Sequence, residues 1–433
     1  MIDKKEKVSV ITLGCSKNTV DSERIISQLR LNDKDIIDDP EKADSVIINT
    51  CGFIEAAKEE SINTILSAVE LKKSGQLKKV YVAGCLSERY MNDLKIELPE
   101  VDRFFGTEDY KNIVEEYGGD LKYELLGERE LLTPKHYAYL KISEGCDNPC
   151  SFCAIPIMRG GHISKPIEKL EQEVNLLAAK GVKELIVIGQ DTTDYGKDIY
   201  GKRVLGDLLN KISENEDIKW IKLLYAYPSH FPDEAIDIIA SNPKLCKYID
   251  MPLQHISDNV LKSMRRGITK RRTIELIDKL KNRIPDLTLR TTFISGYPAE
   301  SEKDFKELVQ FVKDVEFDRM GVFDYSPEDN TVSFDMGDPI SEEVKEERRS
   351  ILMEIQKDIS FQKNNSLIGK QMEVVIDDIS EDRYIARSRR DAPEVDGEVI
   401  IESPEVYLEP GSFNTVEIYD CNDYDLFAKL NSK

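Results

Sequence analysis

The sequence predicts an α/β protein in three parts: an N-terminal open parallel α/β domain, a partial (β/α)6 barrel and a small antiparallel β-barrel. Two observations predict the first two parts, because strand-like apolar runs alternate with helical patterns three times near the start of the chain and six times in its middle. A third observation predicts the last part, which consists of short alternating strands between Gly, Pro and Asp turns. A chain of 433 residues is also too long for one core. We place the boundaries at residues 1–125, 132–364 and 366–433.

The N-terminal part is predicted from three apolar runs, which are VSVITLG (8–14), SVIINT (45–50) and VYVAG (80–84). A helical pattern follows each run, as in TVDSERIISQLRLN (19–32), where apolar residues recur on one side. The arrangement is βαβαβ, which is typical of a parallel sheet with helices on both faces.

One residue type recurs after these three strands. Cys15, Cys51 and Cys85 each lie at the carboxyl end of a strand. A buried free cysteine is the ordinary explanation for any one of them. Because the carboxyl ends of parallel strands form the edge at which ligands bind, three cysteines in this position indicate one shared site.

The middle part is predicted to hold six parallel strands. They are AYLKI (138–142), ELIVIG (184–189), WIKLLYAY (220–227), YIDMP (248–252), LTLRTTFI (287–294) and MGVFDYS (320–326). Amphipathic stretches lie between them, and the one at 165–181 ends on a glycine suited to a helix C-cap. Six such units indicate a barrel-like sheet with its chemistry at the strand carboxyl ends. A long charged helix (340–365) then connects to the last part.

The last part is predicted to be a small antiparallel barrel of five strands. The runs are QMEVVIDDI (371–379), RYIARS (383–388), EVIIES (398–403), FNTVEIYDC (413–421) and YDLFAKL (424–430).

A second group of three cysteines follows the first strand of the middle part. The segment EGCDNPCSFCAIPIMRG (144–160) contains Cys146, Cys150 and Cys153, and the next cysteine is Cys246. Thiolates select zinc, copper(I) or iron–sulfur clusters, and a structural zinc site is closed by four protein ligands. Three thiolates without a fourth therefore favour an iron–sulfur cluster that leaves one iron open for chemistry.

Composition and charge limit the class of protein. Eight cysteines are too few for a disulfide scaffold and indicate a reducing compartment, and the longest nearly uncharged apolar stretch (45–54) is half of a bilayer span. We therefore expect a cytoplasmic protein without a membrane helix. The net charge of −22 opposes nucleic acid as the main partner. It suits a basic protein partner, and it is equally explained by solubility alone.

The C-x3-C-x2-C spacing with Phe152 before the last cysteine resembles the radical S-adenosylmethionine (SAM) enzymes. The resemblance implies that the amino and carboxylate groups of SAM chelate the open iron. An electron passed through the cluster would then cleave SAM to a 5′-deoxyadenosyl radical. We expect Phe152 to adjoin this cofactor site.

The resemblance also implies SAM contacts further along the chain. Gln190 and Asp191 stand where the family often has a Gly-Glu pair that holds the methionine amino group. Arg290 is suited to the methionine carboxylate, although a strand-end salt bridge is its ordinary explanation. Gly296 would let the backbone approach SAM. His255 would line the cavity or make a structural hydrogen bond.

Nearly the whole chain resembles the methylthiotransferases. The resemblance is carried by LGCSKNTVDSE (13–23), NTCGFI (49–54), AGCLSERY (83–90), the second cysteine group and the C-terminal barrel. It implies an N-terminal cluster domain, a radical SAM barrel and a TRAM domain. Cys15, Cys51 and Cys85 would then hold an auxiliary 4Fe–4S cluster that carries the sulfur to be inserted, so that the enzyme has two 4Fe–4S clusters.

The implied reaction uses two SAM molecules, one as methyl donor and one as radical source, and a reducing electron donor such as a flavodoxin or ferredoxin. The radical removes hydrogen from an unactivated C–H bond, which no general base reaches near neutral pH. No acid–base pair is therefore expected, and the catalytic residues stay unassigned. Cys246 and Cys421 belong to neither group and are expected to be plain thiols.

The charge of the last part bears on the substrate. Residues 366–433 contain 7 Lys and Arg against 16 Asp and Glu, whereas an RNA-binding domain should be basic. LGCSKNTVDSE and SRRDAPEVDG (388–397) resemble the RimO-type ribosomal protein methylthiotransferases, although Ser16 and Ala299 replace a common proline and glycine. The resemblance implies action on the β-carbon of an aspartate in the small-subunit ribosomal protein numbered twelve, either free or within the ribosomal subunit.

Two alternatives remain open. A tRNA adenosine methylthiotransferase would use the same chemistry, but the acidic last part makes tRNA an unlikely partner. A non-catalytic iron–sulfur carrier would need neither open clusters nor a cofactor barrel. Arg387, Arg389 and Arg390 are a basic exception within the last part, and we expect them to pair with neighbouring acids rather than with rRNA.

Overall fold

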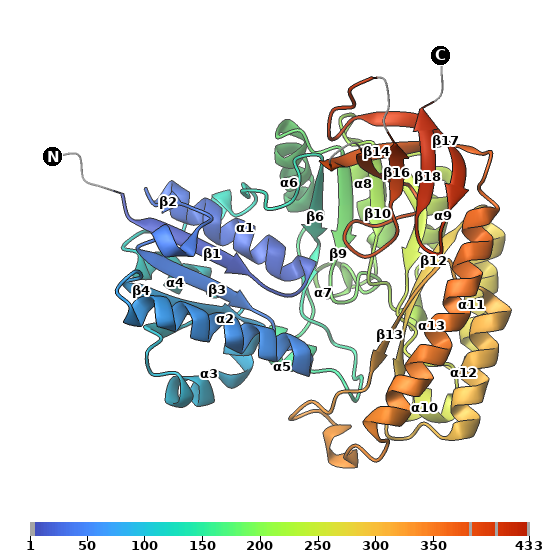
Figure 1. Ribbon diagram of the computed structural model, residues 1–433, viewed down its shortest axis with the longest axis horizontal. Helices are drawn as coiled ribbons and strands as arrows, with labels where there is room; N and C mark the ends of the chain where they lie inside the picture. The colour runs from blue at the N-terminus through green and yellow to red at the C-terminus, as the bar shows by residue number, and fades with distance from the viewer. Residues whose placement is uncertain (1–4, 381–382, 403–405, 431–433) are drawn as a thin grey trace.

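The computed structural model describes residues 5–380, 383–402 and 406–430 and shows two parallel sheets and a closed barrel (Figure 1). The outer ends of the first and last predicted parts, and the final residue of the predicted strand 398–403, lie outside the described residues. Within the described part of the chain, no helix combines the length and the apolar composition that crossing a bilayer requires.

The N-terminal sheet is open and parallel, with strand order β2-β1-β3-β4-β5. Its elements are β1 (Lys7–Thr12), α1 (Ser16–Leu31), β2 (Asp35–Ile36), β3 (Ser45–Thr50), α2 (Glu55–Lys73), β4 (Lys79–Gly84), α3 (Cys85–Glu97), β5 (Arg103–Phe104) and α4 (Tyr110–Glu116). Apolar residues of α1 and α4 pack on one face, and those of α2 and α3 pack on the other. This confirms the predicted sheet and adds two edge strands of two residues each, which are too short to show a periodicity.

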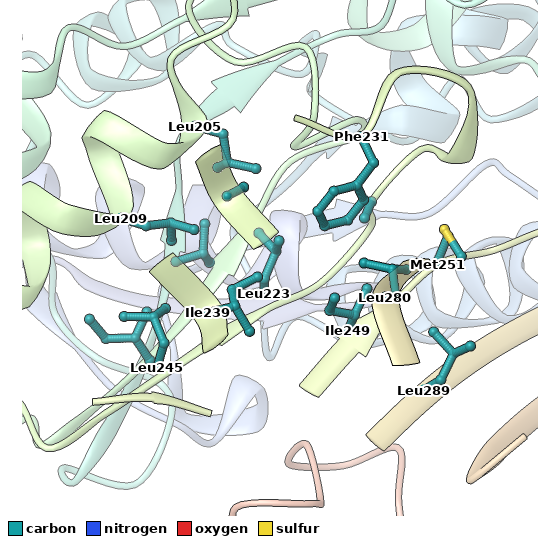
Figure 2. Packing of buried hydrophobic residues seen from close by; sticks show 14 of the residues in the cluster. Leu205, Leu209, Leu223, Phe231, Ile239, Leu245, Ile249, Met251, Leu280 and Leu289 are labelled. Atoms are coloured by element: carbon teal, nitrogen blue, oxygen red, sulfur yellow. The ribbon is translucent and has the colours of Figure 1, made fainter. Parts of the chain in front are cut away.

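The second sheet has six parallel strands in chain order, β6-β9-β10-β11-β12-β13. These are β6 (Tyr137–Lys141), β9 (Glu184–Ile188), β10 (Trp220–Leu223), β11 (Leu245–Asp250), β12 (Thr288–Ser295) and β13 (Arg319–Asp324). The covering helices are α6 (Ile167–Ala179), α8 (Leu205–Ser213), α9 (Asp233–Ser241), α11 (Lys270–Arg283), α12 (Glu302–Val315) and α13 (Glu342–Asn365). Figure 2 shows part of the apolar layer between these helices and the sheet.

Short elements complete the rim of this partial barrel. They are β7 (Ser143–Glu144), α5 (Ile155–Arg159), β8 (Ile163–Ser164), α7 (Lys197–Tyr200) and α10 (Asp258–Ser263). The strand predicted at 220–227 is shorter, because Tyr225 adopts a left-handed backbone conformation with φ of 59° and turns the chain out of the sheet.

The C-terminal barrel is closed in the order β14-β15-β16-β18-β17. Its strands are β14 (Gln371–Ser380), β15 (Arg383–Ser388), β16 (Val399–Glu402), β17 (Phe413–Cys421) and β18 (Leu426–Leu430). The barrel is as predicted except that β16 and β18 pair in parallel, whereas the other pairings are antiparallel. Val375 and Ala392 of this last part pack against aromatic residues inside the second sheet.

The three arginines of the basic cluster in the last part each contact groups within the chain. Arg387 binds Glu184 at 2.7 Å, and Arg390 binds Asp318 at 2.9 Å. Arg389 donates to the Pro243 carbonyl at 2.6 Å. Arg389 also lies 3.6 Å from Glu373, so the expected pairing with acids within the chain is confirmed for all three arginines. Because Glu184 opens β9, the C-terminal barrel meets the second sheet at the amino ends of its strands, away from the edge that carries the second cysteine group.

Replacing Glu184 with glutamine is expected to destabilise this junction. The carboxylate lies fully buried between Lys222 at 2.5 Å and Arg387 at 2.7 Å. Loss of its charge leaves the buried Lys222 without a compensating carboxylate and leaves Arg387 with Asp377 alone, so unfolding should cost about 3–5 kcal/mol less. Urea unfolding at pH 7 measures this, with the exposed Glu216→Gln as control.

The same carboxylate makes stability depend on pH. Burial would raise the pKa of Glu184, but Arg387 and Lys222 outweigh burial and lower the pKa from 4.5 to about 2. The stabilisation is therefore complete above pH 4.5 and is lost as pH falls towards 2, and it is worth about 3 kcal/mol. If Glu184→Gln lost as much unfolding free energy as the wild type between pH 4.5 and pH 2, Glu184 would not be the source of this pH dependence.

Candidate functional site

The first cysteine group gathers at the carboxyl edge of the N-terminal sheet. Cys51 directly follows β3, Cys85 directly follows β4, and Cys15 follows β1 after a two-residue turn. Cys15 is exposed, whereas Cys51 and Cys85 are buried. The topology therefore brings the three thiols to one edge, as predicted, with one side open to solvent.

Glycines allow the loops of this edge to come close together. Gly14 has a φ of +89°, and a Cβ on it would lie 2.7 Å from the Cβ of Cys51. A Cβ on Gly52 would lie 2.8 Å from the Cα of Leu86, next to Cys85. Neither position tolerates a side chain, so the close packing of the three cysteine loops depends on glycine.

Two of these cysteines stand at helix amino ends. Cys15 is the N-cap residue of α1, and Cys85 is the first residue of α3. The positive end of a helix stabilises a thiolate. Burial nevertheless raises the pKa of Cys51 and raises that of Cys85 to about 12. Such thiols ionise when a soft metal binds them, so the donor set fits an iron–sulfur cluster.

The second cysteine group lies beyond β6 on the rim of the second sheet, and each sulfur faces a hydrogen-bond donor. Asn148 Nδ2 donates to Cys146 at 3.4 Å, Arg266 Nη1 donates to Cys150 at 3.4 Å, and the Ile155 amide donates to Cys153 at 3.5 Å. Donors aimed at sulfur stabilise cluster thiolates and tune the cluster potential. This group therefore fits a cluster as well.

The three sulfur atoms of each cysteine group are not arranged around one metal ion. Among residues 5–380, 383–402 and 406–430, no three His, Cys, Asp or Glu side chains are placed to hold one metal ion. A four-iron cluster makes a different demand, because each thiolate binds a separate iron atom.

Three of the predicted SAM contacts lie beside the second group. Phe152 packs against Val260 and the apolar residues around it. Asp191 accepts a hydrogen bond from Asn148 at 2.7 Å, and Gln190 donates to Glu144 at 2.6 Å. The Oε1 atom of Gln190 is buried without a partner, so it is free to accept a hydrogen bond from an amino group.

Arg290, the fourth predicted contact, binds other groups. Its guanidinium contacts Asp250 at 2.9 Å and Asp396 of the last part at 3.3 Å. Two carboxylates already hold it at the junction with the C-terminal barrel, so these contacts favour the strand-end salt bridge over a role toward the methionine carboxylate.

Gly296, the fifth, is required by a packing contact. Its φ is +74°, and a Cβ on it would lie 2.3 Å from the Lys345 side chain of α13. His255 is fully buried, accepts from the Ser257 amide at 3.0 Å and lies 3.2 Å from Glu300. A structural hydrogen bond, the alternative considered for His255, is present.

A buried polar network joins the two cysteine groups, and sequence reasoning did not find it. Arg159 lies 3.3 Å from Cys85 through Nε, and its Nη1 is 3.0 Å from both Asp21 and Glu144. Glu144 in turn accepts from Gln190 beside the second group. Asp21 and Glu144 both contact Lys141. The only sequence signal for this network was the arginine at the end of the second cysteine motif.

A second junction joins the N-terminal part to the segment after β13. Arg89 binds Glu328 at 2.6 Å with both side chains buried, and it donates to the Asp329 carbonyl at 2.8 Å. Lys58 lies 3.4 Å from the same glutamate. The two cysteine groups are therefore held in one arrangement from two sides. Cys246 is buried in the second sheet and Cys421 ends β17, so neither joins the groups.

Known families match each part. The uncharacterized protein family UPF0004 matches residues 7–106, the radical SAM superfamily matches 140–312, and the TRAM domain matches 368–430. The radical SAM methyltransferase TsrM from Kitasatospora setae has a similar fold, with a TM-score of 0.56 and 13% identity over 74% of this chain and 73% of that chain. Fold and site together define a radical SAM protein.

Full-length relatives narrow the assignment. The ribosomal protein uS12 methylthiotransferase RimO of Christiangramia forsetii is 50% identical over 98% of this chain and 94% of its own length. Those of Chloroherpeton thalassium and Bacteroides thetaiotaomicron are each 49% identical over 99% of this chain and cover 100% and 99% of their own lengths. The chain belongs to the RimO family of radical SAM methylthiotransferases.

Proposed function

We propose that this protein attaches a methylthio group to the β-carbon of an aspartate in ribosomal protein uS12. The observation that carries the proposal is the pair of cysteine groups at the edges of two sheets, joined by the Arg159 network. Family membership supports the chemistry, and the acidic last part supports a basic protein as substrate. We place the enzyme in the cytoplasm, with the three parts bounded at 1–125, 132–364 and 366–433.

Each cysteine group is assigned one 4Fe–4S cluster. Cys15, Cys51 and Cys85 would hold the auxiliary cluster, and Cys146, Cys150 and Cys153 would hold the cluster that binds SAM. When bound, these cofactors supply the sulfur, the methyl group and the radical. Phe152, Gln190, Asp191 and Gly296 remain our proposed SAM contacts, whereas the two ion pairs of Arg290 favour a structural role for it. The electron donor is of the flavodoxin or ferredoxin class.

The residues of the chain position and shield this chemistry. Arg159 fixes Cys85 relative to Glu144, and Asn148 ties Cys146 to Asp191. Val375 and Ala392 of the last part pack against aromatic residues of the second sheet and so cover them. The substrate is therefore expected to enter at the opposite edge, where the strands end and the cysteine groups lie.

The choice of substrate is tested by offering recombinant uS12 and bulk tRNA in parallel to the anaerobically reconstituted enzyme with SAM and a reductant. Mass spectrometry should find a methylthio group on a uS12 aspartate and none on tRNA. Arg387, Arg389 and Arg390 contact groups within the chain, so we do not expect this cluster to bind RNA. Addition to tRNA alone would overturn the substrate assignment and leave the cluster assignment in place.

A further inference from the structure

Lys17 is a buried lysine for which the described residues supply no carboxylate partner. It lies two residues after Cys15 in the first turn of α1, and the residue is only 6% exposed to solvent. Its ammonium lies 2.8 Å from the centre of the Tyr225 ring. In the part of the chain that the structure describes, no acidic side chain forms an ion pair with it and no hydrogen bond from it is found. Lys141, Lys222 and Lys345, which are deeply buried near the second sheet as well, each contact carboxylates.

Tyr225 places this ammonium at the carboxyl edge of the second sheet. It follows β10 at the carboxyl edge of the second sheet, and its amide donates to Asp250 at 3.1 Å. Its carbonyl accepts from the Thr192 amide at 3.1 Å, next to Asp191. A tyrosine with a φ of 59° is strained and persists only where its surroundings hold it. Lys17 therefore reaches from the loop of the first group to the rim that carries the second.

The surroundings of Lys17 favour an anion from outside the chain. Burial penalises a charged lysine, and a cation–π contact compensates less than a buried ion pair does. The amino end of α1 adds a partial positive charge at the same place. An anionic ligand would compensate both the buried ammonium of Lys17 and the amino end of α1.

We propose that Lys17 binds the carboxylate of the uS12 aspartate that is to be modified, an inference that rests on the proposed function. The β-carbon of aspartate is bonded directly to the carboxyl carbon. An ammonium that holds the carboxylate therefore fixes the β-carbon beside it, between the sulfur source and the radical source. Asparagine has the same shape without the charge, so Lys17 makes the enzyme select aspartate.

The test measures peptide binding to the reconstituted enzyme with SAM but without reductant, so that no turnover occurs. Two labelled peptides of the uS12 target loop carry aspartate or asparagine at the target position, and fluorescence anisotropy gives their Kd values. The wild type should prefer the aspartate peptide by about 10- to 100-fold. Lys17→Met and Lys17→Gln should bind both peptides alike, and Lys17→Arg should keep most of the preference.

Lys58→Met is the matched control, because Lys58 lies in the first turn of α2, the helix that follows Cys51, but is paired with Glu55 and Glu328. It should keep the preference. The inference is overturned if Lys17→Met and Lys17→Gln still prefer aspartate, or if they lose iron or SAM affinity while the preference stays intact. A wild type that binds neither peptide would instead reject uS12 as the substrate, and the inference would fall with it.

Discussion

Cys85→Ala is expected to abolish methylthio transfer while SAM is still cleaved to 5′-deoxyadenosine. Cys85 lies on the N-terminal sheet, whereas the ligands proposed for the SAM cluster follow β6 of the second sheet. Removing one ligand of the first group therefore leaves the ligands of the second in place. Loss of product should exceed about 100-fold, since even changes outside the ligand shell cost 10- to 100-fold.

Cys153→Ala should abolish both methylthio transfer and the cleavage of SAM, because it removes a ligand of the SAM cluster itself. Cys246→Ala is the control, since Cys246 is a buried thiol outside both groups and its loss should change neither outcome. Anaerobic assays with uS12 measure 5′-deoxyadenosine by chromatography and the modified protein by mass spectrometry. Undiminished product in Cys85→Ala would remove the first group from the reaction.

Arg159→Met is expected to lower the free energy of unfolding by about 3–5 kcal/mol. The variant removes the buried cation that lies 3.0 Å from both Asp21 and Glu144 and leaves Lys141 to compensate for two carboxylates. Burial raises the pKa of each acid, but Lys141 and Arg159 outweigh it and hold both pKa values below their usual range. Without Arg159 these pKa values should rise.

The sign of the pH effect follows from these lowered pKa values. Carboxylates with lowered pKa values stabilise the fold above their unfolded pKa and lose that contribution as pH falls. Arg159→Met should therefore differ most from the wild type near neutral pH and least in acid. Arg159→Lys keeps a charge but loses the planar fork, so its defect should be smaller. Anaerobic denaturant unfolding at pH 7 and at about pH 2.5, below the ordinary carboxyl pKa values, tests this, and equal stability of Arg159→Met and the wild type at pH 7 would contradict it.

The sequence was sufficient to predict what depends on order along the chain. Strand periodicity predicted the sheets, and the position of Cys15, Cys51 and Cys85 after successive strands predicted their meeting at one edge. The two-residue strands β2 and β5 and the parallel pairing of β16 with β18 were missed, because pairing rather than local pattern defines them.

Contacts between segments far apart in the chain could not be predicted from the sequence. Arg159 meets Cys85, 74 positions away, and Lys17 meets Tyr225 on another sheet. The periodicity of a sequence holds no information about contacts between residues so far apart. The contact of Gly296 with the Lys345 side chain was not predicted either, because a sequence can indicate that a position needs glycine but not which group approaches it; the approach of SAM to Gly296 stays a prediction.

The central claim is that two separate open clusters occupy the two cysteine groups. Iron analysis and Mössbauer spectroscopy of the anaerobically reconstituted protein test it most directly. The wild type should bind about eight iron atoms per chain as two 4Fe–4S clusters. The triple alanine variant at Cys15, Cys51 and Cys85 should retain about four. The variant at Cys146, Cys150 and Cys153 should do the same, and SAM should perturb the spectrum only where these last three cysteines are intact. A single cluster in the wild type, or a SAM response that survives without the second group, would contradict the account.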